Sequence, residues 1–135
     1  MGKAGQPLSV SNRTAQAVLG AFLRAFSCLD LGAMLGCVAP EATAFLPAEY
    51  HRTRLQGKGE IGNAFAVVIA RLRATGATSL PLDAHELLVQ EWGDTAAVTC
   101  HLRGEHLSRR TFVFRREATG WHIVHLHASN ATLDE

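Results

Sequence analysis

Two spacings of apolar residues divide the chain at Gly76. Before Gly76, apolar residues recur at i, i+3, i+4 and i+7, which is typical of amphipathic helices. After it, apolar and polar residues alternate, as they do along a strand with one buried face. The sequence therefore predicts an α+β fold in which helices pack on one face of a curved, mainly antiparallel sheet.

Two helices are predicted at the start of the chain. Ser11 or Asn12 can cap the first, because a short polar side chain there accepts a hydrogen bond from the first turn. Its buried face consists of Ala15, Val18, Leu19, Phe22, Leu23 and Phe26. The second helix is shorter, with Asp30 as its cap and Pro40 as the residue that ends it.

A third helix follows the turn at residues 56–59 and ends at Gly76. Six of its apolar residues follow one face: Ile61, Ala64, Phe65, Val68, Ile69 and Leu72. Between the second and third helices, residues 41–46 are expected to form a short strand that stops at Pro47, and residues 50–55 a second one.

Four longer strands are predicted after the helices, at residues 80–92, 95–103, 109–117 and 121–129. Hairpin residues separate them at Gly93-Asp94, Gly104-Glu105 and Thr119-Gly120. Short connections of this kind join neighbouring antiparallel strands, so the four segments should form a meander.

The last of these strands is the most distinctive. Simple alternation places one set of side chains on one face: Trp121, Ile123, His125, His127 and Ser129. The other face then carries His122, Val124, Leu126 and Ala128. Both faces are largely apolar, which predicts a central strand covered on both sides. An apolar wall with a few polar groups is typical of a ligand pocket, although an ordinary strand with edge histidines has the same pattern.

Length and composition limit the possible functions. The chain of 135 residues is expected to form one domain at residues 11–131, with tails at 1–10 and 132–135. The net charge of +1 lacks the basic excess of nucleic-acid-binding proteins. No run approaches the ~18 apolar residues of a membrane span. We therefore expect neither nucleic acid nor membrane as a partner.

Cys28, Cys37 and Cys100 form an odd set without zinc-ligand spacing. This favours a reduced, cytoplasmic location. Cys100 is expected to be a core or interface residue and not a nucleophile, because no neighbouring cation in the sequence activates it.

Three segments carry a family resemblance: residues 31–47 with their APEATAFLP ending, the LQGKGEIGNAF turn into a helix, and the closing GWHIVHLHAS. Together they resemble the nuclear transport factor 2-like, or SnoaL-like, superfamily over about residues 12–131. Within it, the chain is similar to the association domain of calcium/calmodulin-dependent protein kinase II and its free-standing bacterial relatives. That domain shares the pattern Trp-x-x-Val-His-x-His-x-Ser, which begins here at Trp121.

The resemblance implies a cone-shaped half-barrel of the cystatin-like kind, with three helices over a bent mixed sheet and a pocket between them. It also implies a homodimer that pairs through the outer face of the sheet. No cofactor and no metal are implied, although His125, His127 and His101 could in principle approach a transition metal. The superfamily includes isomerases, cyclases, dehydratases, adaptors and association modules, so the fold does not determine the function.

Isomerases of this superfamily place a catalytic base just before the proline that ends the first strand. Leu46 occupies that position here, before Pro47. A leucine cannot accept a proton, so the sequence disfavours isomerase chemistry.

The resemblance to the association domain suggests a polar, arginine-containing pocket that binds small anions. Arg103 matches one pocket arginine, and Gln90 falls where that domain has a histidine. A further arginine position falls near Arg109, Arg110 or Thr111. If Arg103 points inward, alternation makes His101 a pocket residue too. Arg103 could instead point to solvent from a hairpin end.

Several other residues are candidates for the pocket. His127 is either a pocket residue and general acid or base, or a structural hydrogen-bonding residue. Tyr50 is either a phenolic donor at the pocket mouth or a loop aromatic. Glu86 is the remaining carboxylate that could act in catalysis, and Trp121 should line or support the cavity.

Three functions remain open at this point. The first is a homodimeric domain that binds a small, anionic molecule. The second is an enzyme of the isomerase, cyclase or dehydratase type, working through His127 with Tyr50 or Glu86. The third is a module whose only task is association.

Overall fold

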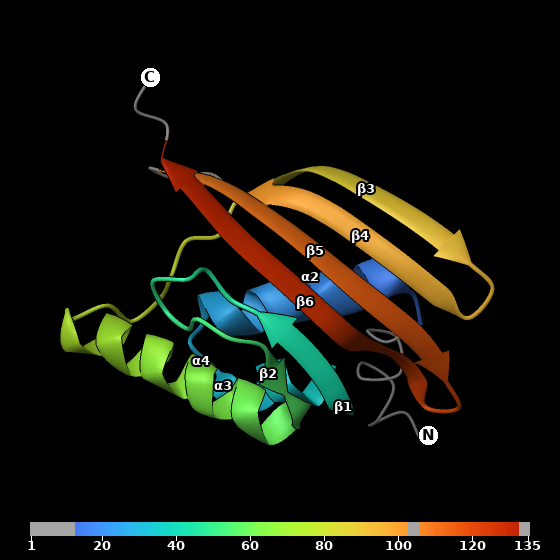
Figure 1. The fold of residues 1–135 in the computed structure, drawn as a ribbon, viewed down its shortest axis with the longest axis horizontal. Helices are drawn as coiled ribbons and strands as arrows, with labels where there is room; N and C mark the ends of the chain where they lie inside the picture. Colours follow the sequence, from blue (N-terminus) through green and yellow to red (C-terminus); the bar gives the residue numbers. More distant parts are fainter. Residues whose placement is uncertain (1–12, 103–105, 133–135) are drawn as a thin grey trace, which may run out of the picture.

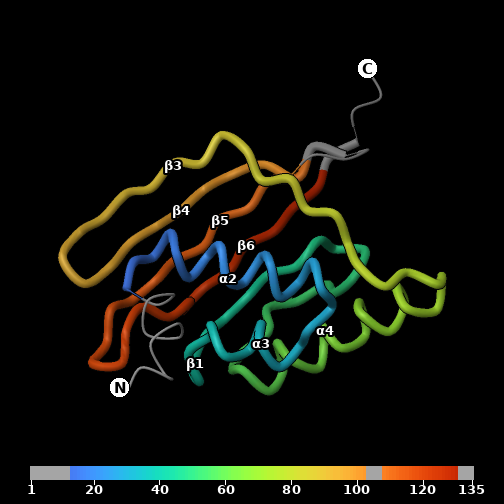
Figure 2. Tube along the Cα trace, turned by 180° about the vertical axis from the view of Figure 1, so that it is seen from behind, coloured from blue at the N-terminus to red at the C-terminus, as the bar shows by residue number. Residues whose placement is uncertain are grey.

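The computed structural model describes residues 13–102 and 106–132. Within them, the helices α2 (Ala15–Ser27), α3 (Leu31–Gly36) and α4 (Gly57–Ala74) lie on one side of a six-stranded sheet. Figure 1 shows the sheet in front of α2, and Figure 2 shows α2 crossing its other face from behind. The predicted α+β fold is confirmed. None of these helices combines the length and hydropathy of a membrane span.

The sheet contains β1 (Val38–Phe45), β2 (Leu55–Gln56), β3 (Ala84–Trp92), β4 (Thr95–Leu102), β5 (His106–Glu117) and β6 (Gly120–Thr132). Its order is β2-β1-β6-β5-β4-β3. β1 and β6 are parallel and every other pair is antiparallel, so the sheet is mixed and remains open. The predicted order of the meander β3 to β6 is confirmed, but β3 begins at Ala84 and not at residue 80, and the predicted turn at Gly104-Glu105 lies outside the described residues.

The first helix begins later than predicted. Thr14 is its cap, and its hydroxyl accepts a hydrogen bond from the Ala17 N–H at 3.0 Å. The expectation of a cap at Ser11 or Asn12 is therefore wrong. The cap of α3 is confirmed, because the Asp30 carboxylate accepts from the Ala33 N–H at 3.1 Å.

Pro40 does not end a helix. α3 stops at Gly36, and Pro40 lies inside β1. The pairing of β1 with β6 is irregular between Val38 and Thr43, and proline is tolerated there because no ladder hydrogen bond needs its missing N–H.

The predicted strand at residues 50–55 is reduced to Leu55–Gln56. Tyr50 instead lies in a turn, where its N–H donates to the Pro47 carbonyl at 2.8 Å. α4 begins directly after Gln56, whose N–H donates to the Glu60 carboxylate at 2.8 Å. This hydrogen bond satisfies a donor at the start of α4. It explains why the helix begins at Gly57, inside the predicted turn at residues 56–59.

A β-bulge changes the predicted faces of β6. Phe114 pairs with Ile123 but Val113 pairs with His125, so Val124 is an extra residue. Trp121 and Ile123 are buried before the bulge, and Leu126 and Ala128 are buried after it. The prediction that His125 and His127 share the face of Trp121 is wrong, because the bulge reverses the alternation.

The sheet therefore has a helix-covered face and an outer face. The core on the helix-covered face includes Val98, Phe112, Phe114, Ile123 and Leu126, each at most 6% exposed. Strand pairing and alternation define the outer face, which carries Thr43, Phe45, His85, Leu88, Gln90, Trp92, Ala97, Thr99, His101, Arg109, Thr111, Val113, Arg115, His122, His125, His127 and Ser129.

Candidate functional site

A cavity of about 480 Å³ lies between the helices and the sheet. Helices α2 and α4 form one side, strands β4, β5 and β6 form the other, and residues 46–50 and 80–82 complete it. Its described lining consists of Phe22, Leu23, Phe26, Leu46, Pro47, Tyr50, Phe65, Val68, Arg71, Leu72, Thr75, Leu80, Pro81, Leu82, Leu102, Ser108, Arg110, Phe112, Leu126, Ala128 and Asn130. This size is ordinary for a small-molecule site, which typically measures ~300–1,000 Å³.

Four phenylalanine rings belong to the lining, three of them from the helices and Phe112 from β5. Phe22 meets Phe65 and Phe112 edge to face, with ring centroids 6.1 Å and 5.8 Å apart. Phe26 meets Phe65 in the same manner at 5.4 Å. These contacts are favourable for aromatic pairs and hold the rings in fixed positions. The cavity therefore offers a firm apolar surface.

Arg110 provides a charged group within this apolar lining. Its Nη1 lies within hydrogen-bond distance of the Arg109 carbonyl at 3.0 Å, the Ser129 carbonyl at 3.1 Å and the Asn130 Oδ1 at 3.1 Å. All these acceptors are neutral, and they fix one edge of the guanidinium. Among the residues described, no hydrogen bond engages its Nε or Nη2.

Burial lowers the pKa of Arg110 below its ordinary value, and Cys100, Tyr50 and Glu49 oppose this effect. The guanidinium stays charged at neutral pH, because arginine pKa values lie so high. None of the described carboxylates lies within ion-pair distance of it. The described lining contains two arginines, Arg71 and Arg110, but neither a carboxylate nor a histidine. Its electrostatic preference is therefore for an anion.

The structure places two of the predicted pocket positions in this cavity. Tyr50 lines it and is 46% exposed, which fits a position at the mouth. Of the three alternatives on β5, Arg110 faces inward, while Arg109 and Thr111 lie on the outer face. Leu46 is also in the lining, so the position of the isomerase base is apolar here.

His127, Gln90, His101 and Arg109 do not line the cavity; all four lie on the outer face. The bulge at Val124 accounts for His127, as described above. For His101 the cause is parity in β4, where Cys100 and Leu102 face inward. Arg103, on which the prediction for His101 depended, lies outside the described residues.

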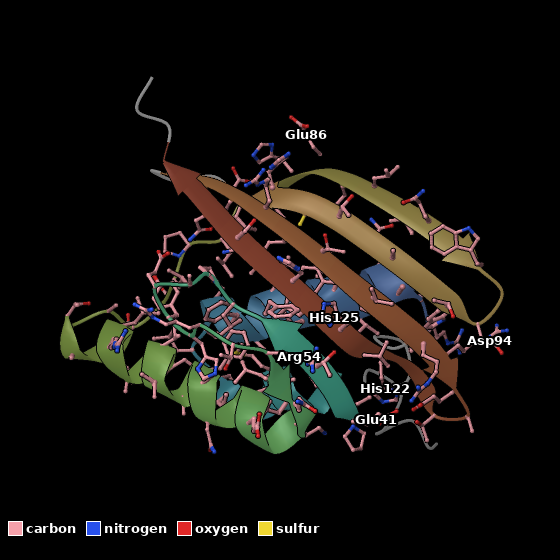
Figure 3. The ribbon with its side chains drawn as sticks, viewed as in Figure 1. Glu41, Arg54, Glu86, Asp94, His122 and His125 are labelled. Carbon is pink, nitrogen blue, oxygen red and sulfur yellow. The ribbon has the colours of Figure 1, made fainter. Side chains whose placement is uncertain are left out.

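Trp121 and Glu86 also lie away from the cavity. Trp121 is buried with the Arg116 guanidinium 5.8 Å from its ring, so it supports the fold at another part of β6. Glu86 is exposed in an irregular part of β3, and its φ of 57° belongs to the left-handed region. Figure 3 shows its carboxylate directed away from the sheet. Cys100 is confirmed as a core residue, and burial raises the pKa of its thiol.

Arg110 could have been found from the spacing in β5. Phe112 and Phe114 are the strongest core residues of that strand, and Arg110 has the same parity. Ser108 follows the same alternation and pairs with Asn130 across the strands. Sequence reasoning gave Arg110 as one of three alternatives and did not name Ser108 or Asn130, because it did not apply alternation to residues 106–117.

The outer face has a different chemistry. His125 lies near the middle of the sheet (Figure 3), and its Nδ1 is 2.7 Å from the Thr43 hydroxyl. The rings of Phe45 and His127 are 5.3 Å apart. Burial lowers the pKa of His125, and the nearby His127 lowers it further. Among the described residues, no three His, Cys, Asp or Glu side chains gather as metal ligands.

Comparison with known families agrees with this architecture. The sequence model of one family, described as a SnoaL-like domain, matches residues 15–133. The chain belongs to the SnoaL-like domain family. No curated protein matches the sequence of this SnoaL-like domain.

Solved structures show the same fold. A protein proposed to be a dehydratase of the NTF2-like family, from Streptomyces avermitilis, is 21% identical, with a TM-score of 0.73 over 93% of this chain and 97% of the other. A proposed calcium/calmodulin-dependent protein kinase type II association domain from Thiobacillus denitrificans is 25% identical, with a TM-score of 0.67 over 89% and 97%. An NTF2-like protein with a cystatin-like fold from Novosphingobium aromaticivorans is 18% identical, with a TM-score of 0.72 over 97% and 87%. The resemblance to this superfamily, including an association-domain relative, is thus confirmed.

Proposed function

We propose that this SnoaL-like domain binds a small carboxylate in the cavity, with Arg110 as its anchor. The observation that carries the proposal is the hydrogen bonding of the Arg110 guanidinium among the described residues. Nη1 is held by neutral oxygens, and no described residue takes a hydrogen bond from Nε or Nη2. Those two nitrogens can donate parallel hydrogen bonds to the two oxygens of one carboxylate.

Binding fits the cavity better than acid–base catalysis. An isomerase-type enzyme needs a base within hydrogen-bond reach of its substrate. In the described lining, Leu46 occupies the usual position of the base, and Tyr50 is the only residue with a titratable proton besides the arginines. The histidine and carboxylate that were considered as catalytic partners, His127 and Glu86, lie elsewhere.

The test compares two neighbouring arginines on opposite faces of β5. Isothermal titration calorimetry with 3-phenylpropanoate is carried out on the wild type, Arg110→Gln and Arg109→Gln. We expect Arg110→Gln to weaken binding at least tenfold, since a hydrogen bond to a charged group contributes about 1.5–3 kcal/mol. Arg109→Gln should bind as the wild type does. Equal binding by both variants would remove Arg110 from the site.

We also propose that two copies pair through the outer face. Leu88 and Trp92 are 56% and 58% exposed there, and the neighbouring positions Ala97, Thr99, Thr111 and Val113 are uncharged. Interface centres are typically depleted of charge and enriched in aromatic residues. Analytical ultracentrifugation should therefore show a dimer, and a stable monomer at micromolar concentration would contradict it.

The three cysteines are free, which supports the proposal of a reducing, cytoplasmic location.

A further inference from the structure

We infer that the ligand is an amphipathic carboxylate, whose acid group binds Arg110 and whose apolar body, preferably an aryl or alkyl chain, occupies the phenylalanine-lined part of the cavity. This inference rests on the proposed function and adds the class of ligand to it. It depends on how the polar and apolar groups are distributed within the cavity.

The polar groups of the strands are gathered at one end of the cavity. Ser108 pairs with Asn130 and Arg110 pairs with Ala128, so these residues occupy adjacent positions on β5 and β6. Tyr50 is close enough to Arg110 to affect its pKa. The carboxylate of a ligand would therefore lie at this end, where both charge and hydrogen-bond donors are available.

The next inward-facing pair along the strands is entirely apolar. Phe112 pairs with Leu126, two residues beyond Arg110 and therefore roughly 7 Å away along the strand. Phe22 packs against Phe112, and Phe65 and Phe26 continue the aromatic wall. The surface therefore changes from polar to apolar within two residues along β5 and β6.

The size of the cavity also favours a ligand with an apolar body. The volume of about 480 Å³ corresponds to roughly sixteen water molecules at ~30 Å³ each. A two-carbon acid would leave most of this space to water, which finds no hydrogen-bond partner on phenylalanine or leucine side chains. An apolar body would displace that water, and each methylene buried should strengthen binding roughly fourfold.

The experiment measures the affinity of the purified full chain for acetate, butanoate, hexanoate and 3-phenylpropanoate by calorimetry. We expect 3-phenylpropanoate to bind at least a hundredfold more tightly than acetate. The neutral analogue 3-phenylpropan-1-ol should bind at least tenfold more weakly than the acid. It should be insensitive to Arg110→Gln, because its hydroxyl carries no charge for the guanidinium to pair with.

Two variants test the apolar wall itself. Phe26→Ala removes a half-buried ring from the lining. Val68→Thr changes the polarity of the lining at nearly constant side-chain volume, so this second variant remains informative if Phe26→Ala folds poorly. Both variants should weaken the binding of hexanoate and 3-phenylpropanoate at least threefold and leave the affinity for acetate unchanged.

The possible failures are distinguishable. If acetate binds as tightly as the longer acids, and all are lost in Arg110→Gln, the cavity is an anion site and the amphipathic inference is wrong. If no acid binds, the proposed function itself fails. If the alcohol binds as well as the acid and Arg110→Gln has no effect, the cavity is simply apolar and both proposals are overturned.

Discussion

The two faces of the sheet differ in the kind of polar side chain they carry. In its described lining, the cavity on the helix-covered face has two arginines and no histidine. The outer face carries five of the histidines: His85, His101, His122, His125 and His127. The chain thus places an arginine in the cavity, where it can anchor an anion, and the histidine rings on the face where a second copy is proposed to pack, together with Arg109 and Arg115. Neighbours in sequence can therefore have unrelated roles.

The bulge at Val124 maintains this separation in β6. Deleting Val124 should abolish cooperative folding, because either Trp121 and Ile123 or Leu126 and Ala128 would move to the outer face. Each large apolar side chain contributes about 1.5–3 kcal/mol when buried, so the loss approaches the whole stability of a small domain, which is ~5–15 kcal/mol. Circular dichroism during thermal unfolding measures this.

The control is Val124→Ala, which keeps the number of residues and should unfold cooperatively with a loss of about 1 kcal/mol. If the deletion variant unfolds like this control, the strand does not depend on the bulge for its pattern of burial.

The contrast between the faces can also be measured at two adjacent residues of β5. Phe112 is 1% exposed and contacts Phe22, whereas Val113 lies half-buried on the outer face. We expect Phe112→Ala to cost about 3–5 kcal/mol of unfolding free energy, since it leaves a cavity in a packed core. Val113→Ala should cost about 1 kcal/mol or less in the monomer. Urea denaturation at low protein concentration provides both values, and similar losses would mean that the outer face is as well packed as the core.

Much of the fold could be predicted because helix and strand periods mark the sequence directly. Asp30 as a cap and Gly93-Asp94 as a turn follow from local chemistry, which tertiary contacts did not override. The faces of β6 could not be predicted in this way. Val124 is apolar, so the apolar pattern of the sequence continues across the extra residue. The side chains on both faces of the strand are therefore predicted to be buried.

The candidate site depended on that same feature. His127 was expected in the pocket because alternation was assumed to continue from Trp121, and one added residue was enough to reverse it. Arg110 belongs to a strand whose alternation is regular from Ser108 to Phe112. The face of the sheet on which Arg110 lies can therefore be deduced from Phe112 alone. Residue parity is reliable where strands pair without a shift, and only pairing with a neighbouring strand reveals a shift.

The smallest predicted effect concerns pH and the outer face. The pKa of His125 is lowered by burial and by His127, so the folded state binds a proton less readily than the unfolded state. Its stabilising contribution is therefore fully present above the ordinary histidine pKa of ~6.5, and it is lost as the pH falls from there through the folded-state pKa. The side chains that face His125 are Thr43, Phe45, His127 and Val113.

None of these neighbours can compensate a new positive charge, and the carboxylates Glu41 and Glu117 of the same sheet are already paired with Arg115. We expect the wild type to lose stability between pH 7.5 and pH 5.5 in urea denaturation, and His125→Gln to lose less. His51→Gln, in the loop between β1 and β2, is the matched control and should retain the wild-type slope. An identical pH dependence in all three proteins would show that protonation of His125 has the same free energy in the folded and unfolded chains. The two faces would then differ in composition but not in their response to pH.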